Sequence, residues 1–258
     1  MELNIQQQLF IVGGATSGFG AAIAKALLTE GASIIAVARG EEKLKELETC
    51  FTGRVDTICA DITQPESMEK IMSVAGNRQI HGVVMNAGGP PAMGALEARL
   101  DDWDGAYKAV LRWKIDLAGR LLPEMIRHQY GRMVFIESAA VKQPIENLVL
   151  STSMRLAVVG YVKTLSQEVA RKGITLNVLA PGSHATPAIN RLIQKKAAQT
   201  GESLEETRNQ HINQTGVGFL GDAADLAGLA LWLLSPQSRF ITGQTISVDG
   251  GTIKGIMG

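Results

Sequence analysis

The sequence has few of the residues that mark secreted, metal-binding or membrane-spanning proteins. Only two of its 258 residues are cysteines, which is too few for a disulfide framework and favours a reducing, cytoplasmic location. Its four histidines are scattered without the spacing of metal ligands, so we expect no metal site. No apolar run approaches the roughly 18 residues of a membrane span, and we expect no export signal at the N-terminus.

The chain also lacks an excess of charge of either sign. Its 25 basic and 25 acidic residues give a formal net charge of zero, and no basic run stands out. We therefore expect neither nucleic acid nor a membrane surface as a partner. A small molecule is the expected partner.

What the chain does contain is an alternation of apolar, β-branched stretches with helical ones. The stretch 33–38 is apolar on both faces, as buried parallel strands are. The alternation predicts an α/β protein with a doubly wound parallel sheet of about seven strands, a single-domain Rossmann fold over residues 1–258. The expected strands are 8–13, 33–38, 55–60, 80–85, 132–137, 173–180 and 244–248.

Helical spacing of apolar residues predicts the segments between these strands. We expect a long helix over 101–128, in which Pro123 predicts a kink or a break. Residues 188–218 are polar, weakly periodic and long for a loop, and such insertions often act as lids over a site. A pair of surface helices is the alternative there. The other expected helices are 21–28, 41–49, 65–75, 151–171 and 222–234.

A glycine-rich turn joins the first strand to the first helix, with the spacing Gly14-x-x-x-Gly18-x-Gly20. Such a turn presents backbone N–H groups and a helix N-terminus at one point, and both attract phosphate. Glycine permits a positive φ and lets a phosphate come close to the backbone. A plain tight turn is the alternative, but the flanking strand and helix favour dinucleotide binding.

The end of the second strand indicates which dinucleotide binds. Arg39 follows Ala38 about 20 residues beyond the glycine turn, at the position that contacts the ribose of the cofactor. An acidic residue there would select NAD, whereas a cation pairs with a 2′-phosphate. NADP(H) is therefore the favoured cofactor and NAD(H) the alternative, while a solvated arginine is the other interpretation of Arg39.

Several motifs resemble those of the short-chain dehydrogenase/reductase superfamily over nearly the whole chain. Gly14-Ala-Thr-Ser-Gly-Phe-Gly20 resembles its TGxxxGIG turn, and Asp61 is similar to the acidic residue that contacts adenine. Asn86-Ala-Gly88 resembles the NAG motif, and Pro181-Gly-Ser-His-Ala-Thr186 the PGxxxT segment that holds the nicotinamide. The cofactor-binding residues that the resemblance implies are Gly14, Thr16, Ser17, Gly18, Phe19, Gly20, Arg39, Asp61, Ile62, Asn86, Ala87, Gly88, Arg155, Pro181, Gly182, His184 and Thr186.

The resemblance changes at the catalytic positions, where the superfamily uses an Asn, a Ser and a Tyr-x-x-x-Lys. Ser138 matches the family's serine, but Ser151 stands at the tyrosine position and Arg155 at the lysine position. Val110 stands at the asparagine position. The chain therefore resembles a divergent subgroup similar to β-ketoacyl carrier-protein reductases, with Ser-x-x-x-Arg at its centre.

These replacements change what the site is able to do. A serine hydroxyl is a far weaker acid than a tyrosine phenol, whose pKa is about 10 in model compounds. Arginine carries a permanent charge and a rigid fork of donors, so Arg155 is able to hold the ribose or stabilise an oxyanion. Ser138, Ser151 and Arg155 are the expected catalytic residues. His184 is a further candidate acid, or a loop histidine that contributes only its backbone.

Three functions follow from this interpretation. The first is an NADP(H)-dependent oxidoreductase that interconverts a carbonyl and an alcohol at an atypical catalytic site. The second is a catalytically weak dinucleotide-binding protein that acts as a sensor or assembly subunit. The third is a scaffold that binds another ligand without redox chemistry. Because helices 101–128 and 151–171 resemble the pair that builds the family's subunit contacts, we expect a homo-oligomer, either a tetramer or a dimer.

Overall fold

The expected strands form one parallel sheet in the computed structural model, which describes residues 2–256. The sheet has seven strands in the order β3-β2-β1-β4-β5-β6-β7, and each neighbouring pair is parallel. The doubly wound Rossmann architecture is confirmed. The strands are β1 (Leu9–Gly13), β2 (Ser33–Ala38), β3 (Val55–Cys59), β4 (Gly82–Met85), β5 (Gly131–Ile136), β6 (Ile174–Pro181) and β7 (Thr245–Val248).

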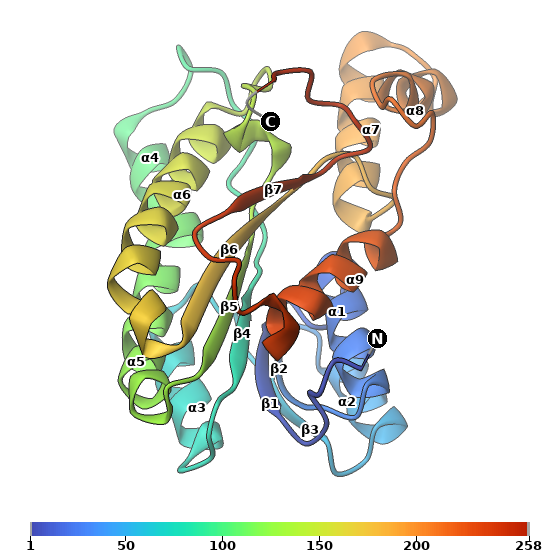
Figure 1. Cartoon of the computed structure of the whole chain (residues 1–258). Coiled ribbons are helices and arrows are strands. Elements are labelled where there is room, and N and C mark those ends of the chain that lie inside the picture. Colours follow the sequence, from blue (N-terminus) through green and yellow to red (C-terminus); the bar gives the residue numbers. More distant parts are fainter. Residues whose placement is uncertain (1, 257–258) are drawn as a thin grey trace.

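Helices cover both faces of the sheet, and each face has its own buried apolar core. Figure 1 shows α3, α5 and α6 on one side of the sheet and α1, α2 and α9 on the other. Because both faces are covered, β1 and β5 are buried along their whole lengths. The helices are α1 (Gly18–Thr29), α2 (Glu41–Cys50), α3 (Pro65–Ala75), α4 (Leu100–Tyr107), α5 (Trp113–His128), α6 (Val149–Val169), α7 (Pro187–Thr200), α8 (Leu204–Asn213) and α9 (Ala223–Leu234).

The strand order reverses between β1 and β4. Val12 in β1 lies beside Ala36 of β2 on one side and beside Val84 of β4 on the other. The loops that leave β1 and β4 therefore diverge to opposite faces of the sheet. A crevice opens at such a reversal outside the carboxyl ends of the strands, and it is where ligands of doubly wound sheets bind.

The long helix expected over 101–128 is interrupted at a different place from the one predicted. Pro123 lies inside α5, which continues unbroken to His128, so the break predicted at Pro123 was wrong. The irregular part is a π-helical segment, Lys108–Arg112, between α4 and α5. The missing N–H of Pro123 costs α5 one hydrogen bond, but Leu117 and Leu121 on the buried face hold the helix against the sheet.

The segment expected as a lid contains two helices rather than a long loop. α7 and α8 together cover most of it, and a capping box between Ser203 and Glu206 starts α8. Weak apolar periodicity concealed these helices because few of their residues are buried. The alternative of a surface helix pair is therefore what the structure has. Figure 1 shows the pair at the upper right, next to the C-terminal end of β6; a lid function stays a prediction.

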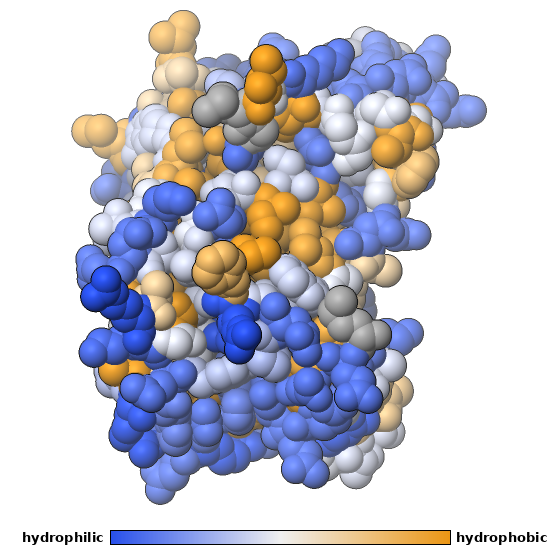
Figure 2. All heavy atoms as spheres, in the orientation of Figure 1, coloured by the Kyte–Doolittle hydropathy of each residue, from blue (hydrophilic) through white to orange (hydrophobic). Residues whose placement is uncertain are grey.

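The surface is uneven in character on the face seen in Figure 2. Hydrophilic side chains cover most of its lower half, while apolar ones gather in the upper half. Within residues 2–256, no helix combines the length and apolar character that crossing a membrane requires.

Candidate active site

The glycine turn after β1 is shaped by two different steric demands. Gly14 has a φ of 64°, and a Cβ there would lie 2.7 Å from the side-chain nitrogen of Asn86. A Cβ at Gly20 would lie 2.3 Å from the carbonyl oxygen of Gly14. Gly20 is thus required so that α1 packs closely on its own turn, a reason that the sequence argument, which invoked positive φ and the approach of a phosphate, did not give. Ser17, at the start of α1, makes no side-chain capping bond.

A cavity of about 460 Å³ opens beside this turn at the reversal of the strand order. Eight of the residues predicted to bind the cofactor line it: Gly14, Thr16, Ser17, Arg39, Asp61, Ile62, Ala87 and Gly88. They come from the ends of β1, β2, β3 and β4. The fold therefore brings together side chains that the sequence argument joined only by motif.

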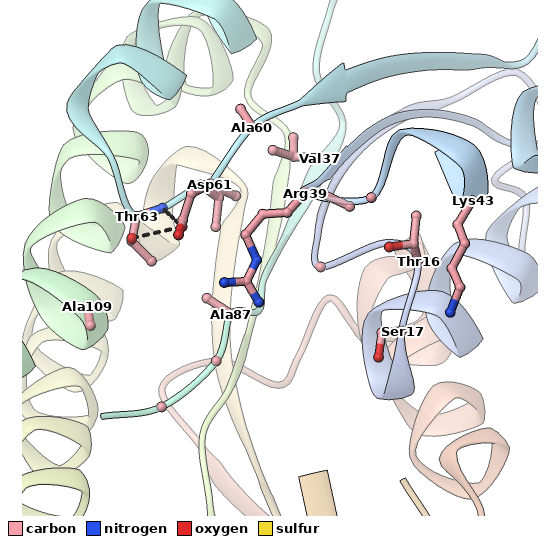
Figure 3. Close-up of a pocket in the computed structure, with 16 residues that line it drawn as sticks. Thr16, Ser17, Val37, Arg39, Lys43, Ala60, Asp61, Thr63, Ala87 and Ala109 are labelled. Carbon is pink, nitrogen blue, oxygen red and sulfur yellow. Dashed lines mark hydrogen bonds between the residues drawn. The ribbon is translucent and has the colours of Figure 1, made fainter. Parts of the chain in front are cut away.

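Two cations line the cavity where one was predicted. Arg39 follows β2, and Lys43 lies in the first turn of α2. In Figure 3, Arg39 reaches into the open space toward Ala87, and the Lys43 amine lies on the side of Thr16 and Ser17. Two positive charges around one opening strengthen the case for a phosphate beyond the diphosphate.

Asp61 is held in place at the opposite wall. One oxygen of its carboxylate accepts hydrogen bonds from the backbone N–H of Thr63, at 3.0 Å, and from the Thr63 hydroxyl, at 2.8 Å. The Asp61 backbone carbonyl accepts a bond from Ser67. The carboxylate is thus oriented before any ligand arrives.

Other predicted cofactor residues support the crevice without lining this cavity. Asn86 donates from its side chain to the Gly13 carbonyl, at 3.0 Å, and so ties β4 to β1. The His184 ring is buried and packs edge-on against Phe19, with ring centroids 5.0 Å apart. The Nδ1 nitrogen of this ring also bonds to the Gly182 carbonyl, at 3.1 Å, so the ring is held in place on two sides.

The segment after β6 lies against the glycine turn. Pro181 ends β6 in register with Val248, and the Gly182 N–H donates to the Val248 carbonyl. Thr186 is buried, and a Cβ at Gly18 would lie 3.8 Å from its methyl group. The two motifs therefore form adjacent walls of the crevice.

Ser151 and Arg155 form a hydrogen-bonded pair on the first turns of α6. Arg155 Nε donates to Ser151 Oγ at 3.1 Å, as spacing i, i+4 on a helix allows. Ser151 Oγ makes no other hydrogen bond within residues 2–256, so its proton is free to be donated. Ser138 Oγ accepts a bond from the Ala140 N–H and is not hydrogen-bonded to Ser151 or Arg155.

A buried carboxylate that the sequence argument missed lies behind the pair. Glu137 is the residue before Ser138, and its side chain is 0% exposed. One of its oxygens accepts from Arg155 Nη1 at 2.8 Å, and the other from Lys114 Nζ on α5. Burial lowers the pKa of Lys114 from 10.5 to about 8, against the opposing attraction of Glu137. We call Lys114, Glu137 and Arg155 the buried charge cluster.

The buried charge cluster meets the crevice through one edge of Arg155. Its second terminal nitrogen, Nη2, makes no hydrogen bond to any residue in the range 2–256. A Cβ at Gly89 would lie 3.1 Å from this nitrogen, and Gly89 lines the cavity. Arg155 therefore places donors beside Gly89, at the wall of the cavity.

Three functional candidates were missed, although each left a trace in the sequence. Lys43 follows Arg39 by four residues at the start of a helix. Lys114 is a lone cation in an otherwise apolar helix face, four residues after Val110. Glu137 is an acid directly after the apolar run Met133–Ile136. A charge in an apolar pattern is a signal of a buried pair, because an unpaired charge is too costly to bury.

This geometry defines a Rossmann-type α/β protein, with a crevice suited to a dinucleotide where the strand order reverses. The family model described as "Enoyl-(Acyl carrier protein) reductase" matches residues 14–252. The chain belongs to this family, and with it to the short-chain dehydrogenase/reductase superfamily of NAD(P)-dependent oxidoreductases.

Curated relatives align with the chain over nearly its full length. The 3-oxoacyl-(acyl-carrier-protein) reductase FabG of Vibrio cholerae is 26% identical over 255 residues, which cover 96% of this chain and 98% of the relative. The protein of the same name in Rickettsia felis is 28% identical, covering 97% and 99%. Dehydrogenase/reductase SDR family member 6 of Rattus norvegicus is 26% identical, covering 96% and 98%.

Solved structures share the fold. YwfH, described as an NADPH-dependent reductase involved in bacilysin biosynthesis, superposes with a TM-score of 0.92 at 23% identity, covering 97% of this chain and all of the other. L-sorbose reductase from Gluconobacter frateurii, complexed with NADPH and L-sorbose, gives a TM-score of 0.92 at 24% identity, covering 99% and 100%. The agreement extends the fold assignment to almost every residue.

Proposed function

We propose that this protein is an NADP(H)-dependent oxidoreductase that interconverts a carbonyl and an alcohol at a site built on Ser151 and Arg155. The observation that carries the proposal is the pair of cations, Arg39 and Lys43, in the cavity next to the glycine turn. A guanidinium and an amine suit a 2′-phosphate, and the residue directly after β2 is Arg39 rather than an acid that would accept from a 2′-hydroxyl. Reductases of the same fold support the choice, since two are described with NADPH.

The residues present fit a dinucleotide along the whole crevice. The N-terminus of α1 has no acidic residue in its first turn and no side-chain cap, which leaves its dipole for a diphosphate. Asp61, held by Thr63 at one wall, would contact the adenine. Pro181–Thr186 would hold the nicotinamide near Arg155. When bound, the cofactor supplies or accepts a hydride.

The chain's own groups supply the electrostatic part of the reaction. Ser151 donates its hydroxyl proton in a hydrogen bond to the substrate's carbonyl oxygen. Arg155 Nε donates to Ser151 Oγ and so holds the serine oxygen in place. Arg155 Nη2 stabilises the negative charge that develops on the substrate's carbonyl oxygen. Neither residue is a strong general acid, so the proton that completes the alcohol comes finally from water.

Titration with both nucleotides, followed by assay, tests the proposal. We expect NADPH to bind more tightly than NADH by fluorescence and to be oxidised in the presence of at least one ketone, aldehyde or imine. Ser151→Ala and Arg155→Ala should each lower that rate, by about 10²-fold for a lost oxyanion donor. Tight binding without turnover would favour the alternative of a sensor or assembly subunit, and absence of binding would favour a different ligand.

A further inference from the structure

The charges buried behind the crevice do not cancel. Lys114 and Arg155 are both cations, and Glu137 is the one carboxylate bonded to both. The side chains of Lys114 and Glu137 are 3% and 0% exposed, so water screens them poorly. The buried charge cluster has a net charge of +1 while Lys114 is protonated and zero once Lys114 is neutral.

This variable charge lies next to the working end of the crevice. Lys114 comes from α5, four residues after Val110, Glu137 from the end of β5, and Arg155 from α6. Glu137 links the two cations directly, one carboxylate oxygen to each. Nη2 of Arg155 carries the effect to Gly89 at the cavity wall. These three side chains are the charged groups acting on one another here.

We propose that Lys114 is a charge-setting and positioning residue: through Glu137, its protonation state sets the positive charge that Arg155 presents at the nicotinamide end of the crevice. With Lys114 protonated, Glu137 divides its negative charge between two cations, and Arg155 acts as a strong electrophile. With Lys114 neutral, Glu137 neutralises Arg155. This inference rests on the proposed function, which places the nicotinamide beside Arg155.

The consequence is a preference between the two redox states of the cofactor. The nicotinamide ring is positively charged in NADP⁺ and neutral in NADPH. A net positive cluster beside the ring weakens the binding of NADP⁺. It also stabilises the negative charge that develops on the substrate's carbonyl oxygen during reduction. Since burial lowers the pKa of Lys114 to about 8, both effects should weaken as the pH rises through this value.

The dissociation constants of NADP⁺ and NADPH, measured by fluorescence at pH 6.5 and 9.5, test the inference without any turnover. For the native chain we expect NADPH to bind about tenfold more tightly than NADP⁺ at pH 6.5, and less so at pH 9.5. Lys114→Met should bind both nucleotides with a small preference that does not change with pH. The 2′-phosphate titrates equally in both ligands, so it cancels in the ratio.

Two further variants serve as controls. Lys108→Met removes a charge from an exposed position just before α5, and it should behave like the native chain. Lys114→Arg keeps a permanent charge and should retain the preference at both pH values, which tests the inference even where Lys114→Met folds poorly. Where a reducible carbonyl is found, the rate of reduction should fall above pH 8 in the native chain and in Lys108→Met but not in Lys114→Met.

The possible failures are distinguishable. If both nucleotides bind and Lys114→Met leaves their ratio and its pH dependence unchanged, the inference is wrong while the proposed function stands. If neither nucleotide binds, the proposed function is wrong and the inference falls with it.

Discussion

Glu137 and Arg155 form a buried ion pair, 2.8 Å between Oε2 and Nη1, in which the carboxylate is 0% and the guanidinium 10% exposed. The pair joins the end of β5 to the start of α6, and Arg155 Nη1 also donates to the Ile136 carbonyl. A buried pair of this kind is costly to break, because removing one partner leaves the other charge without compensation. It therefore fixes where Arg155 points.

Glu137→Gln should destabilise the fold strongly at neutral pH. The change leaves Lys114 and Arg155 as two buried cations without a counter-ion, which costs about 3–5 kcal/mol of unfolding free energy. Urea denaturation measures the loss. Glu69→Gln removes a carboxylate from an exposed pair with Arg120 and should cost about 1 kcal/mol or less. Similar small losses for both variants would contradict the account of the cluster.

The stability difference between the native chain and Lys114→Met should depend on pH above 8. The pKa of Lys114 is lowered from 10.5 to about 8 in the fold, so between these values the folded chain binds fewer protons than the unfolded one. Stability contributed by this residue therefore rises with pH in that window. Denaturation at pH 7 and pH 10 should show that the unfolding free energy of the native chain, relative to that of the variant, rises by up to about 3 kcal/mol between the two pH values. A flat difference would mean that Lys114 keeps its proton.

Arg39→Asp should change the choice of nucleotide. The substitution replaces a cation of the cavity with a carboxylate that repels a 2′-phosphate and accepts from a 2′-hydroxyl. NADPH should lose affinity by about tenfold to a hundredfold, while NADH changes little or gains. Lys43→Met should weaken the binding of NADPH but not of NADH, and by a smaller factor than Arg39→Asp does. Equal losses of both nucleotides in Arg39→Asp would count against the assignment of Arg39.

Gly20→Ala should disturb the glycine turn by steric overlap alone. The added methyl group would lie 2.3 Å from the Gly14 carbonyl oxygen, and such crowding costs about 1–3 kcal/mol. NADPH binding should weaken as the turn moves. Gly228→Ala is the control, since nothing lies within 4 Å of its Cβ inside α9; it should gain about 0.5–1 kcal/mol. Thermal denaturation of both variants makes the comparison.

The expected homo-oligomer is testable by light scattering. Large apolar residues are exposed on the helices named by the resemblance, among them Tyr107, Ile115 and Leu156. Leu156→Glu should weaken the assembly, whereas Leu192→Glu, on α7 and similarly exposed, should leave it intact. A monomeric native chain would show the prediction of a tetramer or dimer to be wrong.

Local patterns were enough to predict the sheet, its parallel strands and half of the crevice. The central strands β1, β5 and β6 could be predicted because both of their faces are buried, and Gly14 and Arg39 because they follow strands directly. The same rules misplaced the irregular part of the 101–128 helix. Pro123 is a strong local signal, but the packing of α5 on the sheet outweighs it, while the π-helical segment at Lys108–Arg112 has no comparable signal.

The order of residues along the chain predicted the Rossmann sheet and the glycine turn, since these depend on neighbours within one strand or one turn, and the family resemblance predicted a centre of Ser151 and Arg155. Only the tertiary structure decided what stands behind that centre. Glu137 meets Lys114 across 23 positions and Arg155 across 18, and no local periodicity relates such distances. The pairing exists because three elements converge on a dry space, where each charge requires another close by.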